Sequence, residues 1–192
     1  MARSNLRICS KSCARILNAK DIAEAHQIAV DATREITGFS RVKIYRFLPD
    51  WSGEVLAESR NDDLPSYLGL HFPSSDIPAQ ARELMKIVRY RAIGDVSDAT
   101  HAIISGKSSA PLDLTWSATR SVSKMHTQYL RNMGVQATFS MSLIQQDTLW
   151  GLIAAHDKKP GLVPFDSWAL IQEISSALML KHDQLERLET AA

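Results

Sequence analysis

The stretch Arg-Ser-Val-Ser-Lys-Met-His-Thr-Gln-Tyr, residues 120–129, decides how the second half of the chain is interpreted. It is typical of a turn that leads into a helix, because Ser123 is a residue type that caps helix N-termini. His126 and Tyr129 are three residues apart and therefore face the same side of that helix. Alternating apolar segments within 137–156 follow and predict a β-hairpin.

A second turn-to-helix stretch, Pro-Ser-Ser-Asp-Ile-Pro, occupies residues 73–78. Asp76 stands just before Pro78, and proline suits the first turn of a helix. Together the two stretches offer a guanidinium, a histidine, a tyrosine and hydroxyl groups, which suit a large, flat, anionic ligand. On spacing alone, two ordinary capped helices with a half-buried histidine are the simpler interpretation.

The other segments predict an α+β fold. Apolar positions at helical spacing predict a helix from Asp21 that ends at Gly38, with another helix before it. Alternating apolar residues predict strands over 41–47 and 54–59. A last helix is expected from about Phe165. Helices at both ends with strands between them indicate an antiparallel sheet flanked by helices.

The length of 192 residues suits one domain with a substantial core. We expect a single domain over residues 1–192, with a core at about 20–160, terminal helices at 1–37 and 165–190 that pack together, and a long insertion loop at 97–116. A polar loop of that length inside a compact domain often serves a function.

Charge and composition exclude several classes of function. The net charge of +1 gives no basic surface for nucleic acid. The apolar run at 149–155 is too short to cross a bilayer, so we expect no membrane partner. Two cysteines and no apolar signal segment at the N-terminus favour a reducing, cytoplasmic setting.

No enzyme motif is complete. Gly106-Lys107-Ser108 resembles the end of a phosphate loop, but position 101, where the partner glycine belongs, is a histidine. Cys9 and Cys13 share a helix face, where a disulfide fits poorly and zinc lacks two further ligands, so they are expected to pack. His26 and His182 are expected on the surface. We therefore predict that the chain is not an enzyme.

Three longer motifs occur together: residues 73–78, the run Met-His-Thr-Gln-Tyr-Leu-Arg-Asn-Met-Gly-Val at 125–135, and Leu-Trp-Gly-Leu-Ile-Ala-Ala-His at 149–156. In this order the chain resembles the chromophore-binding GAF domain of phytochromes, bacteriophytochromes especially. The resemblance runs from about Thr37 to the final helix. Three long motifs in one order outweigh the interpretation as two ordinary capped helices.

The resemblance implies a pocket between sheet and helices for a linear tetrapyrrole, a bilin such as biliverdin. Asp76 would present its backbone carbonyl to pyrrole N–H groups. His126 would lie beside the inner rings, and His156 would bond the carbonyl of the ring that isomerises. The remaining implied contacts are propionate binding by Arg91 and Arg120, hydroxyl contacts from Ser123, Thr138 and Ser140, aromatic packing by Tyr45 and Tyr129, and pocket positions at Ile77, Pro78 and Met125.

One departure concerns covalent attachment. Met125 stands where plant and cyanobacterial members carry the cysteine that holds the bilin. Cys9 and Cys13 do not match the linking position of bacterial members either. Three alternatives therefore stay open: binding without a thioether, attachment through Cys9 or Cys13, or an empty pocket.

Two functional hypotheses follow. In the first, the chain is a photosensory module whose bilin isomerises in light and signals through the terminal helices to an unknown downstream partner. In the second, it is a pigment-free GAF module that dimerises or responds to redox state through Cys9 and Cys13. Apolar stripes on the terminal helices favour a homodimer in either case.

Overall fold

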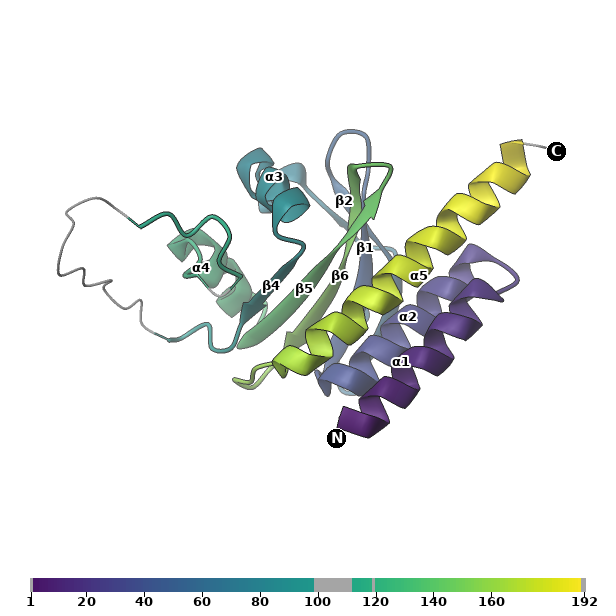
Figure 1. Cartoon of the computed structure of the whole chain (residues 1–192). Helices are drawn as coiled ribbons and strands as arrows, with labels where there is room; N and C mark the ends of the chain where they lie inside the picture. Colours follow the sequence, from purple (N-terminus) through teal and green to yellow (C-terminus); the bar gives the residue numbers. More distant parts are fainter. Residues whose placement is uncertain (1, 99–111, 119, 191–192) are drawn as a thin grey trace.

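The computed structural model describes residues 2–98, 112–118 and 120–190. Helices and strands follow one another as predicted: helices lie at both ends and strands between them (Figure 1). The elements are α1 (Ala2–Leu17), α2 (Ile22–Thr37), β1 (Arg41–Phe47), β2 (Gly53–Arg60), β3 (His71–Phe72), the 3₁₀ turn η1 (Ser74–Asp76), α3 (Ala79–Ile87), β4 (Tyr90–Ile93), α4 (Lys124–Asn132), β5 (Ala137–Gln145), β6 (Thr148–Asp157) and α5 (Phe165–Thr190).

Within the described residues the strands form one six-stranded sheet in the order β3-β2-β1-β6-β5-β4, and every neighbouring pair is antiparallel. Strand β1 lies near the middle, between β2 and β6. The hairpin predicted within 137–156 is β5–β6, with Gln146 and Asp147 at positive φ in its tight turn. The fold is the predicted α+β arrangement with an antiparallel sheet.

Three helices cover one face of the sheet (Figure 1). Helix α2 packs on β1 and β2, α5 packs on β5, and α1 packs outside them against α2 and α5, so the terminal helices pack together as expected. The side chain of Asp21 caps α2 by accepting from the backbone N–H of Glu24 at 2.8 Å. Gly38 ends the same helix at φ 70°, a left-handed conformation that glycine adopts without strain.

Alternate residues of β1 point to opposite faces, and this separates two environments. Val42 and Ile44 belong to the apolar core under α2 and α5. Arg41, Lys43 and Tyr45 therefore face the other side of the sheet, on which α3 and α4 lie (Figure 1). The second face is where the predicted site residues gather.

One histidine on the helical face, His26, is not where the sequence predicts it. His26 on α2 is only 4% exposed, and its Nε2 lies 2.8 Å from Nε2 of His182 on α5. Both rings contact Trp150 of β6. The expectation that these two histidines lie on the surface is wrong for His26, because each ring gives the other a buried hydrogen-bond partner.

Candidate functional site

A carboxylate and two tyrosines meet above the sheet. The turn η1 carries Asp76 close enough to Tyr129 of α4 for its carboxylate to affect the protonation of that phenol. Burial, and after it the negative charge of Asp76, raise the pKa of Tyr129. The same two causes raise the pKa of Tyr45 to about 12. Ile77 packs beside Tyr45 in a small apolar cluster, so both predicted residues adjoin this group.

The N-terminus of α4 sets the position of its histidine. Ser123 caps the helix, and its hydroxyl accepts from the backbone N–H of His126 at 3.2 Å. The rings of His126 and Tyr129 stack at 6.4 Å with an angle of 16° between their planes. Burial, and then the nearby Arg91 cation, lower the pKa of His126. A neutral imidazole and a phenol thus face the sheet together, as their spacing predicts.

Two arginines stand beside this pair. Arg91 of β4 donates from Nη2 to the carbonyls of Arg120 at 2.6 Å and Ser121 at 3.2 Å. Its other terminal nitrogen, Nη1, is buried and has no hydrogen-bond partner in the described part of the chain. Burial and the charge of Arg120 lower the pKa of Arg91 to about 10. A buried N–H without a partner is costly, so Nη1 is a donor suited to an anionic ligand.

The guanidinium of Arg120 takes part in the local backbone structure. Its Nη1 donates to the carbonyls of Thr115 and Ser117, both at 2.9 Å. Part of the predicted loop at 97–116, namely 99–111, lies outside the described residues. Arg120 therefore orders the segment that leads into α4, while its charge remains close enough to affect Arg91.

His156 lies at the end of β6, next to cations that the sequence analysis missed. The amine of Lys43 lies 3.4 Å from Nδ1 of His156. Burial is the largest cause that lowers the pKa of His156 well below its usual value, followed by the charges of Lys43 and Arg41 and by His126. Arg41 forms a buried ion pair with Glu58. The strict alternation along β1 was the available signal, since it places positions 41, 43 and 45 on one face.

Strand pairing places the predicted hydroxyls between these groups. Thr138 of β5 is paired with His156, and Ser140 is paired with Arg91 of β4. Thr138 is buried, whereas Ser140 is half-buried. Both hydroxyls therefore lie on the same face as the histidine and the guanidinium.

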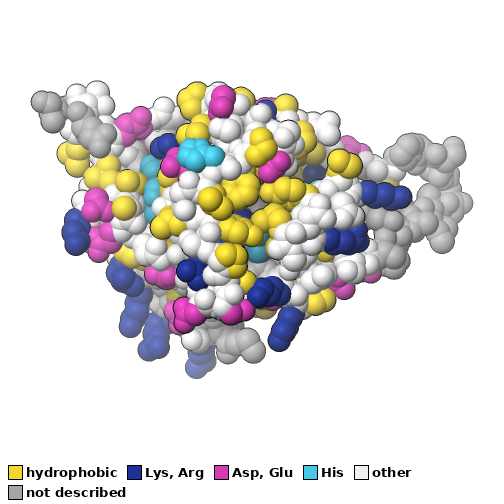
Figure 2. All heavy atoms as spheres, turned by 180° about the vertical axis from the view of Figure 1, so that it is seen from behind, with side chains coloured by type: hydrophobic (Ala, Val, Ile, Leu, Met, Phe, Trp, Pro, Cys, Tyr) yellow, Lys and Arg dark blue, Asp and Glu magenta, His cyan; other side chains and the backbone are white. Residues whose placement is uncertain are grey.

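Three of the predicted site residues are exposed to solvent. Met125 is 82% exposed, so the structure does not bring its side chain into the buried group. Pro78 and the side chain of Ser123 are also exposed. Figure 2 shows the molecule from the side opposite to that of Figure 1: hydrophobic side chains gather in its middle with a histidine visible among them, and lysines and arginines lie around them.

The two cysteines lie on α1, on the far side of the helical layer from this face. Cys9 is buried and its Sγ donates to the carbonyl of Leu170 of α5 at 3.4 Å, while the Sγ of Cys13 lies 4.0 Å away. Burial is the main cause that raises the pKa of Cys9 to about 12. The packing role is thus the one that the structure supports, and the sheet separates both thiols from the predicted site.

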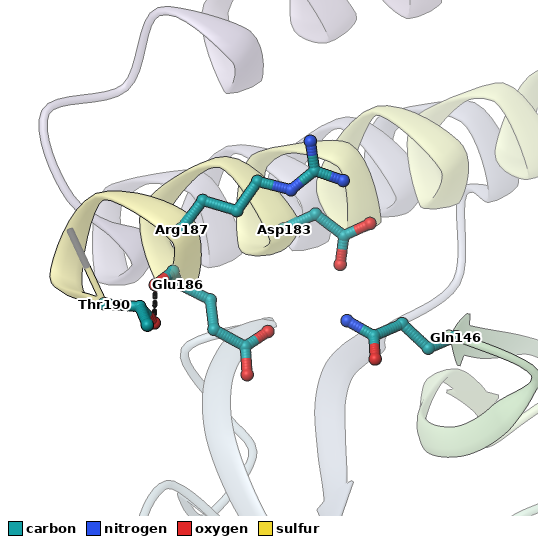
Figure 3. A pocket seen from close by; sticks show the side chains of 5 residues that line it. All are labelled: Gln146, Asp183, Glu186, Arg187 and Thr190. Atoms are coloured by element: carbon teal, nitrogen blue, oxygen red, sulfur yellow. Dashed lines mark hydrogen bonds between the residues drawn. The ribbon is translucent and has the colours of Figure 1, made fainter.

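Two surface hollows lie away from these residues. The larger, of about 430 Å³, is lined by Gln146 and by side chains of α5, with Asp183, Glu186 and Arg187 among them (Figure 3). The smaller, of about 250 Å³, lies beside Tyr90. Glu186 and Arg187 are exposed on α5, Asp183 is half-buried, and both carboxylates accept from the side-chain amide of Gln145.

The described residues hold no group of three or more His, Cys, Asp or Glu side chains arranged for a metal ion. In the same part of the chain, no helix combines the length and the apolar character that a membrane span requires.

A family model for the GAF domain matches residues 21–180. The chain belongs to the GAF domain family. It is 41% identical to a bacteriophytochrome of Pseudomonas aeruginosa over 170 residues. The aligned part covers 85% of this chain and 23% of that protein. A bacteriophytochrome of Xanthomonas campestris is 46% identical over 142 residues, covering 72% and 22%. This GAF domain thus spans about a quarter of the length of the curated relatives.

Solved structures support the same relationship. The chromophore-binding domain of an unusual bacteriophytochrome from R. palustris matches with a TM-score of 0.89 and 37% identity, over 99% of this chain and 64% of that one. That of Stigmatella aurantiaca phytochrome P1 matches with a TM-score of 0.85 and 38% identity, over 92% and 59%. The GAF domain is therefore homologous to phytochrome chromophore-binding domains, as the three motifs predicted.

Proposed function

We propose that this GAF domain binds a linear tetrapyrrole, biliverdin in the first instance, and acts as a photosensory module rather than as an enzyme. The observation that carries the proposal is the buried Nη1 of Arg91, a charged donor without a partner among the described residues. A bilin carries two propionates on a flat apolar body, and guanidinium groups suit carboxylates in geometry and charge. The homology to chromophore-binding domains supports the same ligand class.

The residues around this donor fit the rest of such a ligand. Arg91 would hold a propionate, with Ser140 beside it on the next strand. His126 and His156 are kept neutral by burial, so each carries one N–H that can be donated to a polar atom of the ligand. The backbone carbonyl of Asp76 would accept from pyrrole N–H groups, as the resemblance implies.

A bilin supplies a double bond that isomerises in light. The chain supplies the walls within which a ring can turn: Tyr45, Tyr129 and Ile77 form an aromatic and apolar boundary. The terminal helices would carry the change onward, since α5 packs on β5 of the same sheet. Ring rotation alters hydrogen bonds on one face, and the helices on the other face report it.

The direct test is titration of the purified chain with biliverdin. We expect red absorbance to sharpen on binding, and Arg91→Ala to weaken the affinity roughly 10- to 100-fold, because it removes charged hydrogen bonds. Arg7→Ala changes an exposed arginine of α1 and serves as the matched control. An unchanged free-pigment spectrum with the wild-type chain would reject the proposal and favour the pigment-free GAF module.

We also propose that the module works in the cytoplasm and that two copies pair through α1 and α5. Leucines on these helices remain exposed in one copy, with Leu6 59% and Leu180 60% exposed. Pairing would remove this apolar surface from water. Sedimentation equilibrium measures the mass, and substitution of both leucines by Glu is expected to shift a dimer to monomer.

A further inference from the structure

Lys43 is the most unusual charged side chain on the site face of the sheet. It lies in the middle of β1 and is only 5% exposed. Its Nζ lies 3.4 Å from Nδ1 of His156 and 5.4 Å from the centre of the Tyr67 ring. Lysine is almost never buried to this extent without a partner, so the contact with the imidazole needs an explanation.

The charges around Lys43 do not balance. Arg41 and Lys43 bring two positive groups, and the nearby carboxylate is that of Glu58. That carboxylate is already the ion-pair partner of Arg41 and also accepts from the backbone N–H of Tyr67 at 3.0 Å. In the part of the chain that the structure describes, the hydrogen-bond partner of the ammonium is therefore the imidazole of His156.

The state of His156 decides what this contact can be. Burial and the nearby cations keep the ring neutral, so it carries a single N–H. An ammonium has three donors and no acceptor, hence Nδ1 must be the unprotonated nitrogen when it faces charged Lys43. The proton of the ring then lies on Nε2.

We propose that Lys43 is a positioning residue of the site: its ammonium donates to Nδ1 of His156 and holds the imidazole as the tautomer that carries its proton on Nε2. The site thereby presents an N–H donor, with a cation behind it, to a carbonyl or carboxylate of a bound ligand. The tautomer assignment depends only on the contact within the chain. Its effect on a bilin rests on the proposed function.

The arrangement also makes the site sensitive to pH near neutrality. Burial, and then the charge of Arg41, lower the pKa of Lys43 to about 7, while Glu58 opposes them. The other titratable groups that face the pair are Tyr67 and, from α4, His126. Above pH 7 the neutral amine can also accept a hydrogen bond, so the second tautomer of His156 becomes available.

Nitrogen-15 NMR of the histidine rings tests the tautomer without any ligand. The signals of His156 are assigned by their loss in His156→Gln. We expect Nδ1 unprotonated and Nε2 protonated below the Lys43 pKa of about 7, and a mixture of tautomers above it. Lys43→Met should abolish this pH dependence, whereas Lys20→Met, at an exposed lysine, should leave it unchanged.

Lys43→Arg provides a second, independent variant. A guanidinium stays charged throughout this range, so the Nε2–H tautomer should persist above pH 7. Melting temperatures of all variants establish that each is folded. Identical His156 signals in wild type and Lys43→Met at every pH would overturn the inference.

Biliverdin absorbance in the same variants separates this inference from the proposed function. If biliverdin binds, the position of its red band should change across pH 7 in wild type and lose that change in Lys43→Met. Failure of wild type to bind biliverdin rejects the proposed function, while the NMR result still decides the role of Lys43. Binding together with a His156 tautomer indifferent to Lys43 rejects the inference alone.

Discussion

The two faces of the sheet use neighbouring residues of the same strands for opposite purposes. On the helical face, Ile44 and Phe139 are fully buried in an apolar core. On the site face, one residue away, Lys43 and Ser140 bring an amine and a hydroxyl among histidines and arginines. The period of two in a β-strand is what allows one short segment to build both environments.

The difference shows how stability and binding are divided. The helical face gains free energy from burial of hydrocarbon. The site face instead retains buried donors and cations without full partners, such as Nη1 of Arg91 and the ammonium of Lys43. Groups of this kind cost stability and are retained where a ligand will compensate them.

The largest expected contrast lies between adjacent residues of β5. Phe139→Ala opens a cavity in the apolar core and should lower the free energy of unfolding by about 3–5 kcal/mol. Ser140→Ala faces the site and should change it by less than about 1 kcal/mol, while weakening biliverdin binding. Urea denaturation measures both. Equal destabilisation by the two variants would contradict the division between the faces.

The helical face contains a pair of titrating histidines, His26 and His182, whose effect on stability should be measurable in acid. Burial is the largest cause that lowers the pKa of His26 to about 3 and that of His182 to about 4, from 6.5. The folded state therefore resists protonation that the unfolded state accepts. Stability falls as pH drops below 6.5, with a slope of up to about 1.4 kcal/mol per pH unit for each ring, and it is unaffected by these rings above that pH.

His182→Gln should flatten this slope, because one of the two rings no longer titrates. His71→Gln, at an exposed histidine of β3, is the matched control and should leave the slope as it is. Denaturation midpoints at a series of pH values below neutrality measure the effect. An unchanged slope in His182→Gln would show that the pair is not its source.

A smaller effect is expected at the tyrosines of the site face. Asp76→Ala removes a negative charge that raises the pKa of both Tyr45 and Tyr129. The pKa of Tyr45 should fall below about 12 and stay above its usual value, because burial is the larger cause. Absorbance titration of the tyrosinates measures the change. An unchanged pKa of Tyr45 in Asp76→Ala would show that the Asp76 carboxylate does not interact with the tyrosines.

The smallest effect is expected at the cysteines. They lie across the helical layer from the site, so the double variant Cys9→Ser/Cys13→Ser should keep the affinity of the chain for biliverdin within about a factor of two. The pigment should separate from the wild-type protein on a denaturing gel stained with zinc. If the pigment stays with the wild-type protein on this gel and is lost from the double variant, one of the two thiols is bonded to it. That result would contradict the separation of the cysteines from the site.

Sequence patterns predicted the architecture well, because it depends on local signals. Alternation of Val42 and Ile44 predicted β1, and Gly38 predicted the end of α2. The three motifs predicted the family. Which of the thirteen predicted residues contact a bilin remains a prediction, and Met125 is the one whose exposure agrees least with that role.

Contacts between distant segments were beyond reach. His26 and His182 are 156 residues apart, so nothing local to either predicts that they share a hydrogen bond. The alternation that predicts β1 comes from its apolar residues, and nothing in it marks Lys43 as part of a site. Its hydrogen-bond partner, His156, is 113 residues away in the sequence.

Helix α5 has a mechanical consequence. Its 26 residues span about 39 Å at roughly 1.5 Å per residue. Gln145, at the end of β5, donates to Asp183 at 3.0 Å and to Glu186 at 2.9 Å, well along that helix. Helix α5 is thus held in two places: by apolar packing on the sheet, and nearer its C-terminus by the hydrogen bonds from Gln145. A tilt of about 5° where the helix packs on the sheet would displace the free end by about 3 Å over that length.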